Sequence, residues 1–356
     1  MAGPISKART TCQSEDMADT ASVDTAEAPT VGLPSSGAVP GPAALLDYVA
    51  MMRLDHATKH IFILPGLMLA LLLRGGAAKL ALWPIAAGFL TALLIASANY
   101  VINEWLDRES DAHHPTKSAR PAVRCRIDGR VVWLQWVLLT LAGVAIAASA
   151  SRVMAVIAMA FAGQGVIYNV RPLRSKDYPY LDVITESVNN PLRLLLGWAM
   201  VDPTSLPPSS LIIGYWSGGA FLMGAKRLSE YREIVAAHGK ALLVRYRKSF
   251  ARYNEISLLC SCFVYALFCA MCLAIFFIKY RVEYILVLPA IALLFGKYLA
   301  MSLRPASITQ RPERLFGDPG LMAIVVAVVA IFALCTFVSI PALAPLTAQR
   351  FIALPQ

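Results

Sequence analysis

The sequence predicts an all-α membrane protein, a bundle of about nine transmembrane helices. First, 58% of the 356 residues are hydrophobic and 15% are charged, whereas a typical soluble domain is about 45–50% apolar and about 25% charged. Second, apolar runs long enough to cross a bilayer follow one another from Leu46 onward. Third, lysines and arginines gather in alternate loops between those runs. These observations exclude an ordinary soluble domain.

Residues 1–43 differ in composition from the rest of the chain. They consist mainly of Ser, Thr, Ala, Gly and Pro, with five acidic and two basic side chains. Because no apolar run interrupts them, they are not a secretory signal peptide, and we expect a disordered cytosolic tail in which Met17 is a second candidate start. The predicted transmembrane domain then covers 44–345, and a short C-terminal tail covers 346–356.

Nine apolar segments have the length of a membrane span, which is about 20 residues. They cover 60–78, 81–102, 131–150, 153–169, 181–200, 209–225, 256–278, 282–301 and 319–340. The fourth and sixth are short, and the first contains Pro65 followed by Gly66, which disfavour a helix interior. A count of eight spans therefore stays open.

The basic residues orient the bundle. The loops after the second, fourth, sixth and eighth spans hold 20 Lys and Arg residues, and the loops on the opposite side hold five. Because cytoplasmic loops carry the excess of Lys and Arg, we expect the N-terminus and the basic loops in the cytosol and the C-terminus outside a cell inner membrane.

The chain carries a net charge of +10 although it is mostly apolar, so the location of this charge requires an explanation. A nucleic-acid partner does not account for it, because a nucleic-acid-binding domain does not need this much apolar sequence. We therefore expect the positive charge at the membrane surface or on a phosphorylated substrate. The seven cysteines show no paired spacing in loops, which argues against a disulfide-stapled secreted fold.

The loop after the second span carries a group of acidic side chains. If the helix continues toward Pro115, then Asn103, Glu104, Asp107 and Asp111 fall within an arc of about 100°. Carboxylates that converge in this way repel one another unless a cation joins them, and oxygen ligands suit Mg²⁺. The segment is therefore a candidate Mg²⁺ site, and the alternative is a solvated acidic helix end.

This segment resembles the first aspartate-rich motif of the UbiA superfamily of intramembrane prenyltransferases. The matching pattern is Asn-Glu-x-x-Asp-x-x-x-Asp over 103–111, followed by His-Pro-x-Lys-x-x-Arg-Pro over 114–121. The resemblance covers roughly 45–340 and implies a UbiA-like bundle of nine helices with basic cytosolic loops. One position departs from the family pattern, because Glu104 stands where the family usually has Asp.

The loop after the sixth span distinguishes this chain from aromatic prenyltransferases of the superfamily. Those enzymes carry a second aspartate-rich motif there, whereas this chain has no Asp between Asp202 and Asp318. Direct capture of phosphate by Arg and Lys would replace a second metal. The pattern resembles the decaprenyl-phosphate phosphoribosyltransferase branch, and the alternative is a basic run that only sets topology. The candidate substrate-binding residues of this loop are Lys226, Arg227, Glu230, Arg247, Lys248 and Tyr253.

Three further positions are candidates for substrate binding. Lys59, at the cytosolic end of the first span, is a candidate phosphate contact or an interfacial anchor. Arg193 lies about halfway through the fifth span, where a charge is costly and must face the bundle interior. It would contact substrate or pair with Glu186 or Asp182. His114 would contact phosphate, act in acid–base chemistry or lie on the surface.

The resemblance implies a displacement at an anomeric carbon. Mg²⁺ on Asp107 and Asp111, with Asn103 and Glu104, would bind the diphosphate of phosphoribosyl diphosphate. Further phosphate oxygens would be held by Lys117 and Arg120. A polyprenyl phosphate would be the acceptor, steered by the basic residues of the later loop. Glu230 would bind a ribose hydroxyl or orient those bases.

The product would be a polyprenyl-phosphoryl phosphoribose, a lipid-linked pentose precursor of arabinose for envelope glycans or nodulation factors. Two alternatives stay open. One is an aromatic or quinone-type prenyltransferase that uses a prenyl diphosphate, and the other is a non-enzymatic membrane transporter. The sequence leaves the oligomeric state open, including a homo-oligomer.

Overall fold

The structure is a computed structural model that describes residues 41–75, 81–305, 307, 309, 315 and 317–348. Most of the tail predicted over 1–43, and residues 349–356 of the predicted C-terminal tail, lie outside these residues. Within the described part the regular structure is helical, apart from one parallel pair of two-residue strands. This pair consists of β1 (Gly41–Pro42) and β2 (Cys125–Arg126).

The helices follow the predicted spans closely. Those before residue 180 are α1 (Leu45–Met51), η1 (Leu54–Ile63), α2 (Leu64–Arg74), α3 (Leu82–Asp111), η3 (Lys117–Ala119), α4 (Pro121–Arg124), α5 (Gly129–Ala150), α6 (Arg152–Asn169) and η4 (Ser175–Asp177). Those after it are α7 (Leu181–Ser187), α8 (Asn189–Ala199), α9 (Ser209–His238), α10 (Lys240–Tyr246), η5 (Lys248–Ala251), α11 (Glu255–Tyr280), η6 (Val282–Val287), α12 (Leu288–Ser302), α14 (Pro319–Phe337) and η8 (Pro341–Thr347).

Seven helical stretches of the described residues are long and apolar enough to cross a membrane. They correspond to all predicted spans except the fifth and the sixth. The fifth is divided between α7 and α8, which meet at Val188. The sixth is the apolar first half of α9, whose second half is rich in charged residues. The all-α membrane bundle is thus confirmed, and the count of nine spans stays a prediction.

The Pro65–Gly66 pair does not divide the first span. The 3₁₀ helix η1 leads directly into α2, and Pro65 lies in the first turn of α2. Proline is tolerated there because its missing N–H would have no partner within the helix. Leu45–Arg74 therefore counts as one stretch of membrane length.

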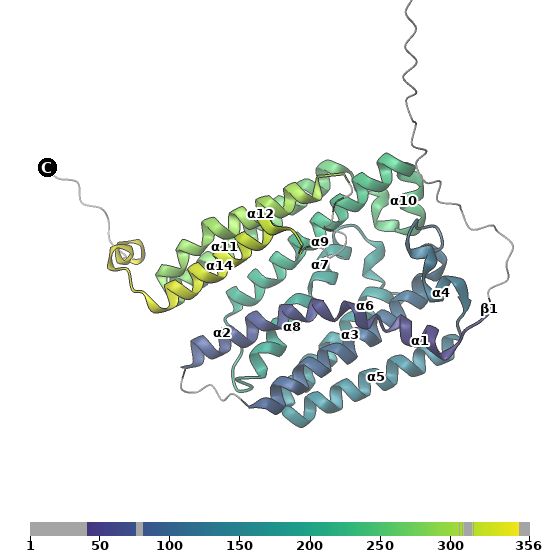
Figure 1. Ribbon diagram of the computed structural model, residues 1–356, viewed down its shortest axis with the longest axis horizontal. Helices are drawn as coiled ribbons and strands as arrows, with labels where there is room; N and C mark the ends of the chain where they lie inside the picture. The colour runs from purple at the N-terminus through teal and green to yellow at the C-terminus, as the bar shows by residue number, and fades with distance from the viewer. Residues whose placement is uncertain are drawn as a thin grey trace, which may run out of the picture. The chain divides into compact units, whose positions relative to one another are not determined.

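The helices pack in two groups, which can be followed in Figure 1. The first group contains α2, α3, α5, α6 and α8, and the second contains α9, α11, α12 and α14. Both α7 and α8 contact α9, which joins the two groups. The charged ends of α3 and α9 thereby come to the same region of the bundle, although 115 residues separate Asp111 from Lys226 in sequence.

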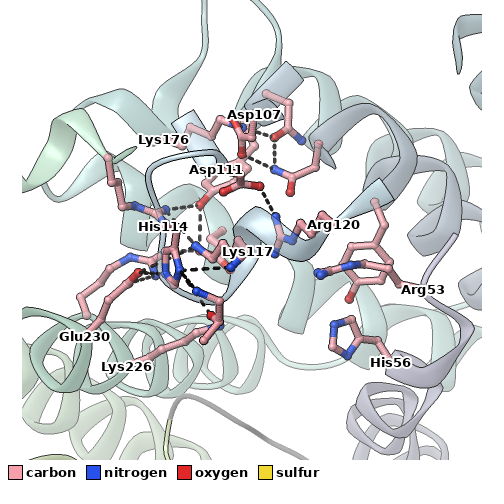
Figure 2. A pocket seen from close by; sticks show the side chains of 18 of the residues that line it. Arg53, His56, Asp107, Asp111, His114, Lys117, Arg120, Lys176, Lys226 and Glu230 are labelled. Atoms are coloured by element: carbon pink, nitrogen blue, oxygen red, sulfur yellow. Dashed lines mark hydrogen bonds and ion pairs between the residues drawn. The ribbon is translucent and has the colours of Figure 1, made fainter. Parts of the chain in front are cut away.

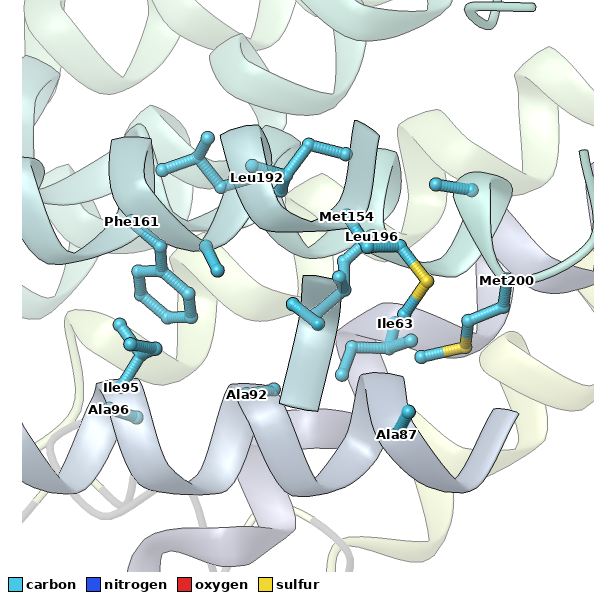
Figure 3. Packing of buried hydrophobic residues seen from close by; sticks show 14 of the residues in the cluster. Ile63, Ala87, Ala92, Ile95, Ala96, Met154, Phe161, Leu192, Leu196 and Met200 are labelled. Carbon is cyan, nitrogen blue, oxygen red and sulfur yellow. The ribbon is translucent and has the colours of Figure 1, made fainter. Parts of the chain in front are cut away.

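Small side chains let α3 pack closely against its neighbours (Figure 3). Ala87, Ala92 and Ala96 of α3 belong to a buried cluster that includes Phe161 of α6 and Leu196 of α8. In a bilayer the tails are as apolar as leucine, so helices associate through close van der Waals contact, which small residues favour.

The outer helices expose large apolar side chains. Leu138 on α5, Phe263 on α11 and Val326 on α14 are 57%, 66% and 65% exposed. Exposed apolar side chains along whole helices are unfavourable in water. They suit a surface that faces lipid.

We expect Gly197→Ala to lower the thermal stability of the protein in detergent. A Cβ at Gly197 would lie 2.2 Å from the Ile63 carbonyl oxygen and 2.9 Å from the Leu67 backbone nitrogen, because the backbone of α8 is in contact with the junction of η1 and α2. Overpacking of this kind costs about 1–3 kcal/mol. The control is Gly163→Ala on α6, where a Cβ has nothing within 4 Å. An equal melting temperature for both variants would contradict this account of the crossing.

Candidate active site

The two charged regions of the sequence line one cavity of about 780 Å³. Nine Lys and Arg residues and five Asp and Glu residues line it, a net charge of +4 with neutral histidines. Figure 2 shows Asp107 and Asp111 on one side of this cavity, with Lys226 and Glu230 on the facing side. Part of the positive excess of the chain is therefore gathered around this cavity.

Three of the four polar residues predicted at the end of α3 line the cavity, namely Asn103, Asp107 and Asp111. They do so because α3 continues nine residues beyond the predicted end at 102. Asp107 Oδ1 accepts hydrogen bonds from Lys176 Nζ at 2.6 Å and Arg174 Nη2 at 2.8 Å. The Asn103 amide donates to Asp107 Oδ2 at 3.3 Å.

Glu104 is not among the residues that line the cavity. Its side chain is buried, where Oε1 accepts a hydrogen bond from the backbone N–H of Ala122 at 3.3 Å and Oε2 pairs with Arg53 Nε at 3.5 Å. Glu104 lies at one edge of the arc that the four residues occupy on α3. Glu104 therefore joins α4 and Arg53 to α3, whereas the sequence predicts that it is a metal ligand.

The segment after α3 folds back over the cavity. Arg120 pairs with Asp111 nine residues earlier, and Lys117 and His114 reach across to Glu230 on α9. The distances to Glu230 Oε1 are 3.9 Å from Lys117 Nζ and 3.8 Å from His114 Nε2. Both predicted loops therefore contribute side chains to one polar cluster.

The carboxylate of Glu230 is held in its charged form. Burial raises its pKa, but the charge of Lys117, the contact with His114 and the charge of Arg227 outweigh burial, so its pKa lies well below the usual range. Burial lowers the pKa of His114, despite the neighbouring Glu230. A neutral imidazole is therefore expected at neutral pH. Tyr246 of α10 donates a hydrogen bond from its hydroxyl to Glu230 Oε1 at 3.1 Å.

Arg227 is the centre of a buried ion-pair network. Its guanidinium is 3.3 Å from Asp182 Oδ2, 2.6 Å from Glu186 Oε2 and 3.2 Å from Glu230 Oε2, and the residue is 2% exposed. Each of the three guanidinium nitrogens thus contacts one carboxylate. Arg227, expected as a phosphate ligand, contacts the cavity but is committed to protein partners because α7 supplies two acids beside it.

Asp182 gathers a second set of partners from the segment after α9. Ser249 and Tyr253 donate hydrogen bonds from their hydroxyls at 3.1 and 2.7 Å, and Arg247 Nε lies 3.6 Å away. Arg247 also donates to the Tyr168 hydroxyl at 2.7 Å. Tyr253 is buried away from the cavity. It therefore supports Asp182 in place of the substrate contact expected for it.

Lys248 points away from the cavity. It is exposed and lines a separate hollow with Arg171, Arg174 and Tyr178. The neighbouring Arg247 faces inward, because the backbone is extended at Arg247 before the 3₁₀ turn η5. The sequence expectation that these two bases act as a pair is therefore not met by the geometry.

Lys176 lines the cavity, although its place in a short basic loop predicts only a contribution to membrane topology. It is 5% exposed, and its ammonium donates to Asn169 Oδ1 at 2.7 Å as well as to Asp107. Burial lowers the pKa of Lys176 to about 8, although Asp107 raises it. The available signal was its position in a short loop that follows Asn169, a polar residue at the end of an apolar span.

Arg193 does not pair with Glu186 or Asp182, the partners that the sequence offered. Both acids are bound by Arg227 and Arg247. The Arg193 side chain lines the cavity, donates to the Asn189 carbonyl oxygen at 3.2 Å and lies over the Phe161 ring. The structure therefore leaves its charge directed at the cavity.

The donor set fits a divalent ion that is shared with a substrate. Among the described residues, no three His, Cys, Asp or Glu side chains come together as a metal cage. Asp107 and Asp111 line the cavity one turn apart, next to the amide of Asn103. Proteins commonly hold Mg²⁺ by one or two carboxylates plus phosphate oxygens of the substrate, which this pair matches.

Comparison with known proteins gives one family and one fold. A model of the UbiA prenyltransferase family matches residues 62–317. A nodulation protein, NoeC of Azorhizobium caulinodans, is 31% identical over 188 residues, which cover 52% of this chain and 59% of that protein. The chain therefore matches less than two thirds of the length of this relative.

Solved structures share the fold. A UbiA homologue from Archaeoglobus fulgidus, bound to DMAPP and Mg²⁺, superposes with a TM-score of 0.60 and 18% identity, over 82% of this chain and 100% of that one. The same homologue bound to GPP and Mg²⁺ gives a TM-score of 0.60 and 19% identity over the same shares. A digeranylgeranylglyceryl phosphate synthase gives a TM-score of 0.54 and 14% identity over 82% and 96%.

We expect Arg227→Met to destabilise the protein strongly. Removing the guanidinium leaves Asp182, Glu186 and Glu230 buried without their shared cation, and breaking a buried pair costs about 3–5 kcal/mol. Thermal unfolding in detergent measures the effect. The matched control is Arg232→Met on the same helix, whose partially exposed pair with Glu255 is worth about 0–1 kcal/mol. Equal losses in the two variants would contradict the role of Arg227.

Proposed function

The chain belongs to the UbiA prenyltransferase family, and on that premise we propose that it is a Mg²⁺-dependent phosphoribosyltransferase of the membrane. It would move a 5-phosphoribosyl group from phosphoribosyl diphosphate to a polyprenyl phosphate. One observation carries the proposal: the side of the cavity lined by α7, α9 and the segment after α10 offers cations, and two of its carboxylates, Glu186 and Glu230, are bound by Arg227. On α3, Asp107 and Asp111 line the cavity one turn apart, and this pair would share a metal with a diphosphate.

Asp107 and Asp111 would hold the metal, with Asn103 beside them. Bound there, Mg²⁺ would neutralise charge on the diphosphate leaving group. Lys176, Arg174 and Arg120 now neutralise the same two carboxylates. These cations are therefore close enough to turn to phosphate oxygens when a diphosphate arrives, and Arg matches phosphate with a two-pronged contact.

The transfer requires little acid–base chemistry from the protein. An oxygen of the acceptor phosphate forms a bond to C1 of the ribose, and the bond from C1 to the diphosphate oxygen breaks with release of pyrophosphate. The acceptor oxygen is already ionised, so it needs no general base. The neutral, buried His114 then serves to connect the first loop to Glu230. Positive charge developing on the ribose would be stabilised by the carboxylates of α3.

The similarity to NoeC supports a proposal about how the lipid-linked product is used. A nodulation protein is among the relatives of this chain, and we infer that the lipid-linked pentose supplies arabinose to nodulation factors or envelope glycans. The donor is water-soluble, so we place the cavity and the N-terminus on the cytosolic side of a cell inner membrane. The charge asymmetry of the loops supports this orientation.

A prenyltransferase acting on an aromatic acceptor is the second candidate. The observation that favours it is that solved relatives of the same fold hold DMAPP or GPP with Mg²⁺. Such an enzyme would transfer the prenyl group itself. The two functions differ in which substrate carries the diphosphate, and a direct assay separates them.

We expect membranes that contain the protein to transfer label from phosphoribosyl diphosphate into the lipid fraction when polyprenyl phosphate is present. EDTA should abolish the transfer, and Asp107→Asn should lower it by about 10²-fold or more because charge on the leaving group is no longer neutralised. Labelled prenyl diphosphate with 4-hydroxybenzoate is the parallel assay. Product in that assay alone would overturn the proposal in favour of the aromatic prenyltransferase.

We expect donor use to weaken at alkaline pH. Lys176, whose pKa lies at about 8, is charged below that pH and loses its charge as the pH rises through it. A phosphate contact is lost with the charge, so kcat/KM for phosphoribosyl diphosphate should fall over the same range.

The matched variant for this prediction is Lys176→Arg. Arginine stays protonated throughout this range, so the variant should keep its kcat/KM to higher pH. The pH profiles of the two proteins, measured with saturating acceptor, make the comparison. Superimposable profiles would show that Lys176 does not contact the donor.

A further inference from the structure

Three cations that line the cavity have no carboxylate partner among the described residues. Each of the other six lining Lys and Arg residues has a carboxylate oxygen within 4.0 Å. The three exceptions are Lys59, Arg193 and Lys226. They come from η1, α8 and α9, so the tertiary structure alone places them around one space.

Arg193 is the best-defined of the three. The residue is 6% exposed, so it is buried in the bundle, yet it lines the cavity. Its one hydrogen bond within the described residues goes from Nη1 to the Asn189 carbonyl oxygen, and its Nε is buried without a partner. The Phe161 ring lies 5.1 Å from the guanidinium carbon. Most of its donors therefore remain available.

The surroundings of Arg193 are incompletely satisfied as well. The Asn189 side-chain oxygen, which also borders the cavity, is buried without a hydrogen-bond partner. Lys59 donates one hydrogen bond, to the Tyr100 hydroxyl at 3.3 Å, and Lys226 makes no hydrogen bond or ion pair with the described residues. Buried charges are ordinarily paired, because leaving them unpaired costs several kcal/mol each. The pattern is that of a site completed by an anionic ligand.

We propose that Lys59, Arg193 and Lys226 form a second anion subsite that holds the phosphate of the acceptor lipid. The proposal rests on the function proposed above and names its acceptor class: a prenyl monophosphate. It separates the two phosphate-bearing substrates by charge. The diphosphate would bind beside Asp107 and Asp111, where a metal can be shared. The monophosphate would bind between the three cations, whose neighbours Glu186 and Glu230 are already bound by Arg227.

Charge and depth favour a lipid monophosphate over a carboxylate acceptor. A phosphate monoester carries close to two negative charges and three acceptor oxygens, which suits three cations. Lys59 and Lys226 each stand one residue outside a predicted span, whereas Arg193 lies within one, beside the apolar wall formed by Phe161 and Ala96. A headgroup attached to a chain in the bilayer can reach this depth while its apolar chain stays among the helices.

The residues of this subsite differ from those that the sequence predicts to bind the acceptor phosphate. Arg227 is committed to three carboxylates, Arg247 contacts Tyr168 and Asp182, and Lys248 lies outside the cavity. Of the four bases expected to steer the lipid phosphate, Lys226 is the one that lines the cavity without a carboxylate partner among the described residues. Lys59 and Arg193, which come from the other half of the chain, complete the set.

The test uses the full-length protein in detergent, with farnesyl phosphate as the probe and farnesol as its uncharged match. In EDTA, farnesyl phosphate should bind and raise the melting temperature, and farnesol should not. Arg193→Met and Lys59→Met should each weaken binding by about tenfold or more, the loss typical of a hydrogen bond to a charged group. Neither should change the binding of phosphoribosyl diphosphate with Mg²⁺ by more than about twofold. The matched control is Arg152→Met, an exposed arginine at the start of α6.

Folding is checked on the same samples. Arg193→Met removes a buried unpaired charge, so without ligand its melting temperature should equal or exceed that of the parent protein. A loss comparable to that expected for Arg227→Met would show that Arg193 is structural and would overturn the proposal. Unchanged affinity for farnesyl phosphate in Arg193→Met and Lys59→Met would overturn it as well. So would 4-hydroxybenzoate, if it bound as tightly as farnesyl phosphate and lost affinity in the same two variants.

The outcomes separate this subsite from the proposed function. If membranes fail to transfer label from phosphoribosyl diphosphate while Arg193→Met still loses farnesyl phosphate, the function fails and the subsite stands. If transfer occurs and Arg193→Met leaves the KM for polyprenyl phosphate unchanged, the function stands and the subsite fails. A rise in that KM, with the KM for the donor unchanged, supports both.

Discussion

Arg227 lies buried where α7, α9 and the segment after α9 meet, and its guanidinium bonds three carboxylates. Much of the charged end of the bundle depends on this arrangement. Asp182, on one side of it, holds Ser249, Tyr253 and Arg247. Glu230, on the other, receives Lys117 and His114 from the loop after α3. One cation therefore links both predicted loops across the cavity.

Asp182, Glu186 and Glu230 are bound by Arg227, so the two sides of the cavity differ chemically. The α3 side keeps Asp107 and Asp111, each balanced by cations that can turn to a phosphate. On the opposite side, Lys59, Arg193 and Lys226 have no carboxylate oxygen within 4.0 Å among the described residues. A site with this division suits two anionic substrates, one that brings a metal and one that does not.

The bilayer explains why so much charge is gathered in one place. Most helices expose apolar side chains outward, so ionisable groups are confined to loops or to the bundle interior, where they must be paired or functional. The composition that first excluded a soluble domain, few charges with a positive excess, follows from this confinement. The net charge of +4 around the cavity accounts for a substantial part of the excess.

Sequence alone determined the helical bundle, because hydropathy records the thickness of the bilayer directly. The spacing of Asp107 and Asp111 on one helix face predicted that they would lie together, and both line the cavity. The sequence did not determine which charges pair. Arg227, Lys248 and Lys226 are alike as bases of one loop, yet the first is bound by carboxylates and the second points outward. The third lines the cavity and has no ion pair with the part of the chain that the structure describes. Lys176 lines the cavity and Glu104 does not, because each is held by contacts with segments distant in the chain. Pairing is a short-range property of three-dimensional packing, so only the tertiary structure decided it.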